Sequence, residues 1–374
     1  MKITVNRAGF IKALKIVRMA TKPASHEDRF FYDAVEIKAA HCQILLACAE
    51  PNQPKSIETS LDAEVEGEPF AFAVNLRNLL RLVLSLRSEA ITLSIESSLK
   101  PLSIEGGEFS LTIPNIDPKN VFVSHVVSQV CDTPVRGLLK AASRVWHSAS
   151  KEEARPVLQA VQFNGRVAAT DGFRIAVLPE SFDGVHGLVP AAILRLSRTL
   201  FRGNDVLVKV SGIRFSISDG VTTLNTNLIE GNFPDVDVII PKSRKMIIEM
   251  PASDLCSAMR TVLACYKADG YGSQFLQMKI SQKEGEQGLV TAKITARSDE
   301  HRMTAQMDAV LIALQDLALP FEIVLNAQFI ADAASQFGAD SVQLCFNAAN
   351  LPVVLKSSDQ MDPLVVVVMP GHIG

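Results

Sequence analysis

The chain has 374 residues, 48% of them hydrophobic and 21% charged, with a formal net charge of −3. This hydrophobic content excludes general disorder, and no window holds the ~18 unbroken apolar residues that a membrane-spanning helix needs. The length exceeds what a single hydrophobic core usually supports, so we expect two or three domains.

The N-terminus and the cysteines indicate an intracellular protein. Met1–Val5 is followed at once by polar Asn6-Arg7, so the apolar region of a secretory signal peptide is missing. The cysteines show no Cys-x-x-Cys pair and no histidine at ligand spacing, and we expect buried free thiols in a reducing cytoplasm. Because the histidines also form no catalytic or metal-binding pattern, we expect no metal, no cofactor and no catalytic residue. The cysteines are Cys42, Cys48, Cys131, Cys256, Cys265 and Cys345.

A strand followed by a helix recurs three times, about 120 residues apart. The copies are Lys2–Asn6 with a helix through Phe10, Leu14 and Val17; Ser128–Asp132 with Pro134–Trp146; and Lys245–Met250 with Ser253–Cys265. In the second copy we expect Asp132 or Thr133 as the N-cap and Pro134 at the first helical position.

Each copy carries a second unit of strand, helix and strand, followed by alternating strands with hairpin turns. These units are Ala71–Val74, Asn75–Arg87 and Ala90–Ser94; Gly187–Val189, Pro190–Arg202 and Asp205–Val210; and Phe321–Leu325, Asn326–Phe337 and Ser341–Phe346. The repeats predict an α+β fold of three domains, each with two helices packed on antiparallel sheet. The predicted domains are 1–124, 125–243 and 244–374, with boundaries in the proline-containing segments 116–125 and 230–244.

Basic residues concentrate on the predicted helices, whereas the rest of the chain is acidic. One basic helix is usually a solvated face, but the recurrence in all three repeats favours a shared surface that faces the phosphates of double-stranded DNA. No recognition helix, zinc finger or RNA-binding motif is visible, which fits binding without regard to sequence. The predicted DNA-facing residues are Lys12, Lys15, Arg18, Lys22, Arg77, Arg81, Arg136, Lys140, Arg144, Lys151, Arg195, Arg198, Arg202, Arg260 and Lys267.

The segment Thr170–Val177 lies near the middle of the chain and reads as a strand, an Asp-Gly turn and a second apolar strand that contains Arg174. No glycine-rich loop opens a helix here, so a phosphate-binding turn is not favoured. Taken alone, the segment is a structural turn.

Over its full length the chain resembles the bacterial DNA polymerase III β subunit family, the sliding clamps. The resemblance rests on the threefold repeat and on three segments: Thr170–Ala176, similar to the family's Thr-Asp-Gly-His-Arg-Leu-Ala; Leu228–Asp235; and Val367–Pro370. It implies a head-to-tail homodimer whose six domains form a ring around duplex DNA, with helices lining the hole. It also implies a non-catalytic processivity factor of replication.

The resemblance further implies a hydrophobic pocket on the second and third domains. Replicative and repair polymerases and the clamp loader would insert a short Gln/Leu/Phe-containing peptide there. Arg174 either contacts that peptide or braces the C-terminal strand. The pocket positions fall on Leu158, Thr170, Gly172, Phe173, Arg174, Ile175, Pro234, Val238, Ile239, Asn326, Phe329, Pro352, Val353, Val367, Val368, Met369 and Pro370.

Several departures from the family pattern leave an alternative open. Ala191-Ala192 stands where the family often has a basic pair, Val238 where it often has Arg, and Phe173 where it usually has His. The tail after Met369-Pro370 also differs. The alternative is a specialised or diverged second clamp that acts as a protein-interaction module with a weakened replication role. A third hypothesis is an enzyme that acts on a phosphorylated or acidic ligand through Asp171 and Arg174.

Overall fold

A computed structural model of the chain describes residues 1–21, 33–40, 42–50, 54–68, 70–97, 100–117, 132–203, 205–268, 274–297, 302–338 and 340–371. The chain divides into two compact units. The first unit comprises Met1–Leu138, Asp183–Val185 and Arg195–Leu228, and the second comprises Leu139–Phe182, His186–Leu194 and Ile229–Gly374. Among the described helices, none is both long and apolar enough to cross a membrane.

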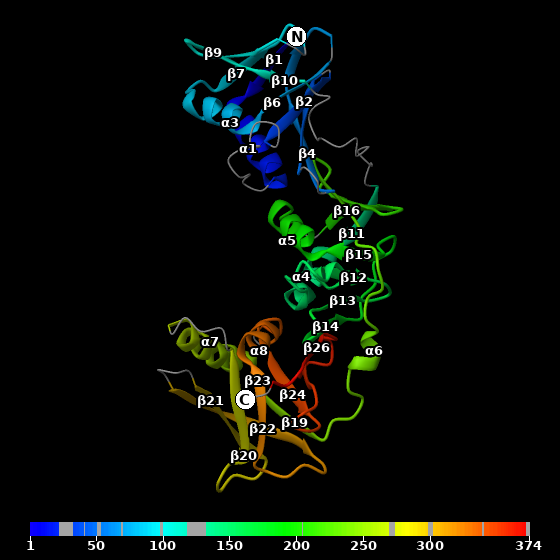
Figure 1. The fold of residues 1–374 in the computed structure, drawn as a ribbon, viewed down its shortest axis with the longest axis vertical. Coiled ribbons are helices and arrows are strands. Elements are labelled where there is room, and N and C mark those ends of the chain that lie inside the picture. The colour runs from blue at the N-terminus through cyan, green and yellow to red at the C-terminus, as the bar shows by residue number, and fades with distance from the viewer. Residues whose placement is uncertain are drawn as a thin grey trace. The chain divides into compact units, whose positions relative to one another are not determined.

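The first unit carries helices α1 (Arg7–Val17) and α3 (Leu76–Ser85) on antiparallel sheet (Figure 1). Its strands are β1 (Lys2–Asn6), β2 (Ala34–Ala40), β3 (Gln43–Ala49), β4 (Ser56–Asp62), β5 (Glu64–Glu66), β6 (Ala71–Asn75), β7 (Ala90–Ser94), β8 (Leu102–Gly106), β9 (Phe109–Ile113), β10 (Asn115–Ile116), β11 (Thr133–Arg136), β16 (Asp205–Ser211), β17 (Arg214–Ser218) and β18 (Thr222–Asn227). The described strands pair in the orders β5-β1-β7-β8-β9 and β10-β6-β2-β3-β4-β18-β17-β16-β11. Helix α1 packs on α3, β3 and β4 and buries Phe10, Leu14 and Val17, as the sequence pattern predicts.

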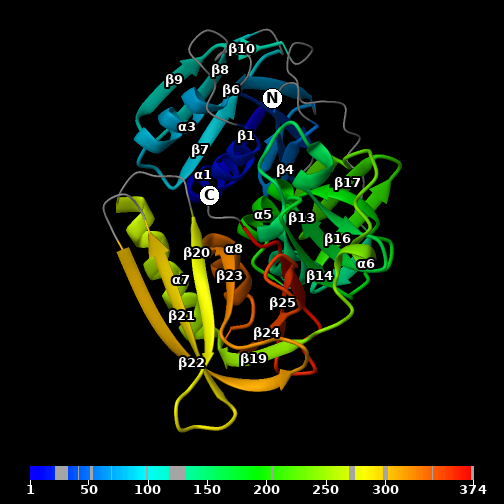
Figure 2. The ribbon, with the colours of Figure 1, turned by 60° about the horizontal axis from the view of Figure 1, so that its bottom comes forward.

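The second unit is built on one antiparallel sheet, whose described strands run in the order β15-β12-β13-β14-β26-β25-β24-β19-β22-β21-β20-β23. Its strands are β12 (Ala160–Phe163), β13 (Val167–Thr170), β14 (Arg174–Leu178), β15 (Gly187–Pro190), β19 (Met246–Pro251), β20 (Phe275–Gln282), β21 (Leu289–Arg297), β22 (Arg302–Leu314), β23 (Phe321–Asn326), β24 (Ser341–Phe346), β25 (Val353–Ser357) and β26 (Val365–Val368). Helices α7 (Ala252–Ala268) and α8 (Ala327–Ala334) pack side by side and contact this sheet (Figure 2). The other α-helices in the described part of the chain are α4 (Leu138–Val145), α5 (Ala191–Leu200), which contributes residues to both units, and the short α6 (Val236–Ile239).

Asparagine begins three of the helices in the same way. The side chain of Asn6 accepts from Gly9 N at 3.0 Å, that of Asn75 from Asn78 N at 3.0 Å, and that of Asn326 from Gln328 N at 2.9 Å. An Asn cap satisfies a backbone N–H that has no partner within the helix. The order of strands and helices repeats as predicted, and it confirms the α+β class.

Both large sheets continue across the predicted domain boundaries. Strand β4 of the first repeat pairs with β18 of the central repeat, and β14 of the central repeat pairs with β26 of the third. The two compact units therefore divide the central repeat between them. The three domains 1–124, 125–243 and 244–374 stay a prediction.

The predicted start of the second repeat is wrong. Thr133–Arg136 is strand β11, with Pro134 opposite Leu207 of β16, and α4 begins only at Leu138. Strand β11 ends the order of its sheet, and a proline that cannot donate to the ladder is tolerated on such an edge strand. Gly137, at φ +78°, then turns the chain into the helix. Most of the predicted strand Ser128–Asp132 lies outside the described residues.

Candidate functional site

The turn between β13 and β14 is held by its own hydrogen bonds. The Thr170 hydroxyl donates to the Arg174 carbonyl at 2.7 Å and accepts from Gly172 N at 3.1 Å. One Asp171 oxygen accepts from the backbone N–H groups of Phe173, at 2.9 Å, and Arg174, at 3.0 Å. Gly172 has φ +92°, which a residue with a side chain rarely adopts. These bonds leave the Phe173 side chain 60% exposed.

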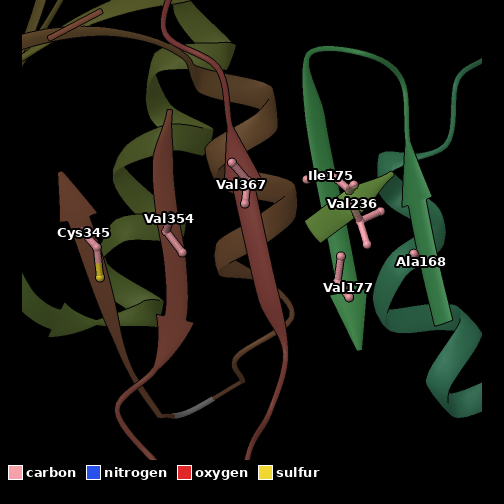
Figure 3. Packing of buried hydrophobic residues seen from close by; sticks show 7 residues of the cluster. All are labelled: Ala168, Ile175, Val177, Val236, Cys345, Val354 and Val367. Carbon is pink, nitrogen blue, oxygen red and sulfur yellow. The ribbon is translucent and has the colours of Figure 1, made fainter. Parts of the chain in front are cut away.

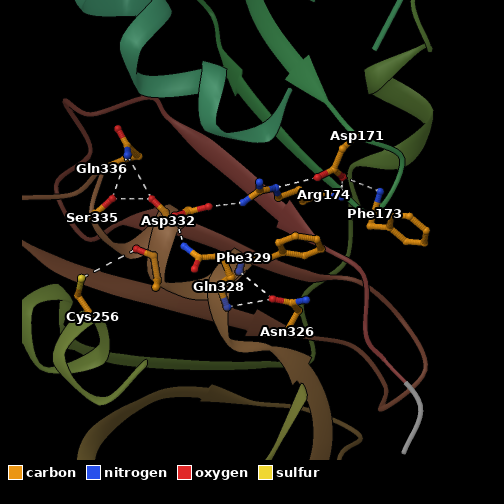
Figure 4. Close-up of polar contacts among 11 residues, drawn as sticks. Asp171, Phe173, Arg174, Cys256, Asn326, Gln328, Phe329, Asp332, Ser335 and Gln336 are labelled. Atoms are coloured by element: carbon orange, nitrogen blue, oxygen red, sulfur yellow. Dashed lines mark hydrogen bonds and ion pairs between the residues drawn. The ribbon is translucent and has the colours of Figure 1, made fainter. Parts of the chain in front are cut away.

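Arg174 connects this turn to helix α8 (Figure 4). Its Nε lies 2.9 Å from Asp171 Oδ2, and its Nη1 lies 2.6 Å from Asp332 Oδ2 on α8. The guanidinium carbon lies 4.3 Å from the centre of the Phe329 ring, a cation–π contact. With 9% of its side chain exposed, Arg174 is committed to protein groups.

The C-terminal segment docks on the same turn. In the pairing of β14 with β26, Arg174 is opposite Val368 and Ile175 is opposite Val367. Beyond the strand, Met369 N donates to the Phe173 carbonyl at 2.9 Å. Gly371 N donates to Val324 O at 2.9 Å, and a Cβ at Gly371 would collide with the ring of Phe275. This close approach explains a glycine in the tail.

A cluster of buried apolar side chains packs between these strands and α6. It consists of Ala168, Ile175, Val177, Val236, Cys345, Val354 and Val367, which come from five strands and α6 (Figure 3). Its members are 0–6% exposed, so they form core and not a contact surface. We call this group the junction cluster.

The predicted pocket residues fall into three groups by exposure. Phe173, Val238, Ile239 and Met369 are exposed apolar side chains, and Gly172 is also exposed. The partly exposed residues are Leu158, Arg174, Pro234, Asn326, Phe329, Pro352 and Pro370. The buried residues are Thr170, Ile175, Val353, Val367 and Val368. Because buried side chains cannot touch a ligand directly, the last group is excluded from direct contact with a ligand.

A cavity of about 640 Å³ brings Phe173, Arg174 and Phe329 together. It is also lined by polar residues that the predicted pocket does not include: Ser150, Lys151, Glu152, Asp171, Gln274, Gln328 and Asp332. Asp332 is not among the pocket residues predicted from the sequence, yet it lines this cavity together with them. Its spacing of three from Phe329 places both on one helical face, which is the signal that could have found it.

Helix α6 lies where the sequence predicted only a linker. The Asp235 carboxylate caps the helix by accepting from Asp237 N at 3.0 Å. Arg166 donates two hydrogen bonds, of 2.7 and 2.8 Å, to the carboxylate of Asp237. Hydrogen bonding by Arg166 lowers the pKa of Asp237 below its ordinary value. The helix directs Val236 into the junction cluster and leaves Val238 82% exposed.

The predicted DNA-facing residues differ in whether their side chains are exposed or already engaged in ion pairs within the protein. Arg144 forms a paired hydrogen bond with Asp362 at 2.7 and 2.6 Å, and Arg77 lies 2.6 Å from buried Asp33, so both serve as structural ion pairs. Arg136 lies on strand β11, not on a helix, beside Asp205 at 3.3 Å. Arg195 is half-buried. Exposed residues are Lys12, Lys15, Arg18, Arg81, Lys140, Lys151, Arg198, Arg202 and Arg260; Lys22 and the side chain of Lys267 lie outside the described part.

The cysteines are only partly as expected. Cys48, Cys256 and Cys345 are buried free thiols, and burial raises the pKa of Cys48 to about 12. Cys42 is an exposed free thiol because it lies in the turn between β2 and β3. Cys131 and the side chain of Cys265 fall outside the described residues. In the part that the structure describes, no cluster of His, Cys, Asp and Glu could hold a metal ion.

Comparison with known proteins finds the same relatives by sequence and by fold. Residues 133–235 match the family described as DNA polymerase III beta subunit, central domain. The chain is 24% identical to the beta sliding clamp of Caulobacter vibrioides over 397 residues, 99% of each chain. It is 25% identical over 237 residues, 60% of each chain, to the beta sliding clamp homolog GriR of Streptomyces muensis. Two solved structures cover all of both chains at a TM-score of 0.83: Caulobacter crescentus pol III beta, 20% identical, and the Bartonella birtlesii DnaN sliding clamp bound to griselimycin, 21% identical.

These likenesses define the fold as that of a sliding clamp, with repeated domains of helices on antiparallel sheet. Residues 133–235 match the central domain of the DNA polymerase III β subunits, and the chain is similar to a beta sliding clamp over 99% of its length, which bears out the resemblance seen in its sequence.

Proposed function

We propose that the protein is a DNA sliding clamp: a non-catalytic processivity factor that forms a head-to-tail homodimeric ring around duplex DNA in the bacterial cytoplasm. The observation that carries this function is the alignment with a beta sliding clamp over 99% of both chains. Exposed Lys and Arg side chains on α1, α3, α4 and α5 support contact with phosphates. A closed ring holds DNA topologically, so such contacts can be weak and still permit sliding.

The same function assigns the exposed apolar residues to partner proteins. Phe173, Val238, Ile239 and Met369 would receive a short Gln/Leu/Phe-containing peptide of replicative and repair polymerases and of the clamp loader. The Bartonella birtlesii sliding clamp, which has the same fold, is solved with griselimycin bound, so a protein of this fold can hold a ligand.

Solution mass and retention on circular DNA test the ring. At micromolar concentration we expect the mass of a dimer, twice 40.6 kDa. Loaded onto nicked circular DNA, the protein should stay bound in high salt and be released when the circle is cut once. A monomer, or equal retention on circular and linear DNA, would contradict the clamp function.

A specialised second clamp remains the alternative, and one comparison favours keeping it. The relative GriR is named a beta sliding clamp homolog, so the family includes members outside the standard name. In this chain Ala191 is buried and Ala192 carries no charge where the family often has a basic pair. Retention on circles together with failure to support processive synthesis by its own polymerase would favour this alternative; normal synthesis would exclude it.

A further inference from the structure

Arg174 occupies a node at which three parts of the candidate site meet. Its backbone belongs to β14 and pairs with Val368 of β26. Its side chain reaches Asp171 in the turn and Asp332 on α8, at 2.9 and 2.6 Å. Asp332 is itself oriented by Gln328, whose amide donates to the other carboxylate oxygen at 2.7 Å.

Contacts made by Arg174 help to fix the positions of three neighbouring residues, Phe173, Phe329 and Met369. Phe173 is oriented because its backbone N–H donates to Asp171, the acid that Arg174 grips. Met369 is oriented because its N–H donates to the Phe173 carbonyl. The Phe329 ring is held under the guanidinium at 4.3 Å. Removing the guanidinium would therefore loosen all three at once.

The same contacts leave Arg174 poorly placed to bind a partner. A ligand carbonyl or carboxylate would have to displace charge-assisted hydrogen bonds from a side chain that is 9% exposed. Breaking such a pair leaves an unpaired, partly buried carboxylate on α8, which is unfavourable.

We propose that Arg174 is a positioning residue of the partner site: acting through Asp332 and Phe329, it holds α8 against the 170–174 turn and so sets the spacing of Phe173, Phe329 and Met369. This role presupposes the peptide-binding function proposed above. It also selects the ligand, because a cavity lined by the rings of Phe173 and Phe329 favours an aromatic side chain over a small one.

A double-mutant cycle on the full-length protein separates positioning from direct contact. The variants are Arg174→Gln, Asp332→Asn and the double variant. The probes are two synthetic peptides that contain Gln and Leu and differ only in having Phe or Ala at the aromatic position. Kd is measured by calorimetry. Each single variant should weaken the Phe peptide by about tenfold, and the double variant should be no weaker than Arg174→Gln, because both changes break one link.

The ratio of the Kd values for the Ala and Phe peptides measures the preference for an aromatic side chain. General destabilisation of the protein should not change this ratio, whereas the Arg174 and Asp332 variants should lower it. The matched control is Arg144→Gln, which removes a similarly buried double hydrogen bond, to Asp362, in the same unit without touching the turn. It should lower the melting temperature and keep both Kd values.

Four results would overturn the role. Additive losses of about a hundredfold in the double variant would place Arg174 in direct contact with the peptide. An unchanged Kd in Arg174→Gln would show that Arg174 does not position the site. An equal loss of peptide affinity in Arg144→Gln would show that the effect comes from general destabilisation. Should Arg174→Gln not fold, Asp332→Asn decides alone, because it breaks the ion pair by removing only the charge of Asp332 and keeps a side chain of the same size. Wild-type protein that is retained on DNA circles but binds neither peptide would overturn the positioning role while leaving the ring intact.

Discussion

Met369 and Val367 lie two residues apart in the C-terminal segment and have different roles. Met369 is 39% exposed beside Phe173, whereas Val367 is 1% exposed in the junction cluster. The resemblance to the sliding clamps implied that both belong to the pocket, and an apolar run in the sequence does not reveal which side chains a neighbouring strand will cover.

We therefore expect substitutions at the two residues to affect different quantities, peptide binding at Met369 and stability at Val367. Met369→Ala should weaken binding of a Gln/Leu/Phe-containing peptide by about 1–2 kcal/mol and leave unfolding nearly unchanged. Val367→Ala should lower the free energy of unfolding by about 2 kcal/mol, from two lost methyl groups and a small cavity, with a lesser effect on the peptide. Calorimetry and urea unfolding measure the two quantities; the reverse pattern would contradict the assignment.

At the scale of elements, an ion pair fastens α4 to the segment that enters β26. Arg144 binds both oxygens of Asp362 and donates to the Gln336 carbonyl at 3.2 Å, next to the end of α8. Burial alone would raise the pKa of Asp362, but hydrogen bonds from Arg144 and Leu364 N lower it below its ordinary 3.8. The carboxylate is thus stabilised in the folded state in its charged form.

This pair should make stability depend on pH in acid. Because the folded-state pKa lies below the unfolded one, the contribution is complete above the unfolded value of 3.8 and is lost as pH falls through the folded-state pKa. At pH 7 Arg144→Gln should lower the free energy of unfolding by about 2 kcal/mol. The difference from wild type, measured by urea unfolding between pH 7 and pH 3, should shrink at the acid end. A difference that stays constant would show that Asp362 does not carry the effect.

For the whole molecule, contact with DNA depends on which basic side chains are exposed and not already paired with acidic residues of the protein, so that they can bind phosphate. Lys12 and Lys15 of α1 and Arg198 of α5 are exposed, whereas Arg144 is engaged with Asp362. Each phosphate contact contributes about 0.9 to the slope of log K against log salt.

Replacing Lys12, Lys15 and Arg198 together with Gln should therefore reduce that slope by about 2–3. Equilibrium binding to a short duplex across a salt series measures it. Arg144→Gln is the control and should leave the slope unchanged although it lowers stability. An identical slope in the triple variant would show that these side chains do not face the duplex.

The sequence by itself determined the order of the elements, the α+β class and the resemblance to the sliding clamps. Strand and helix periods, the Asn residues before helices and the turn around Gly172 are local signals, and local hydrogen bonding enforces them. The start of α4 was the local failure, since a proline at residue 134 suits a helix start and an edge strand equally.

Only the tertiary structure decided what each side chain does at the site. From the sequence Arg144 was expected to face DNA, and Arg174 to contact a peptide or brace the C-terminal strand. In the fold α4 and β14 bring them to Asp362 and Asp332, acids far along the chain. Likewise Ile175 and Val367 became core because β14 and β26 pair and α6 covers them. Pairing between distant segments is set by the packing of the whole chain, and no local pattern encodes it.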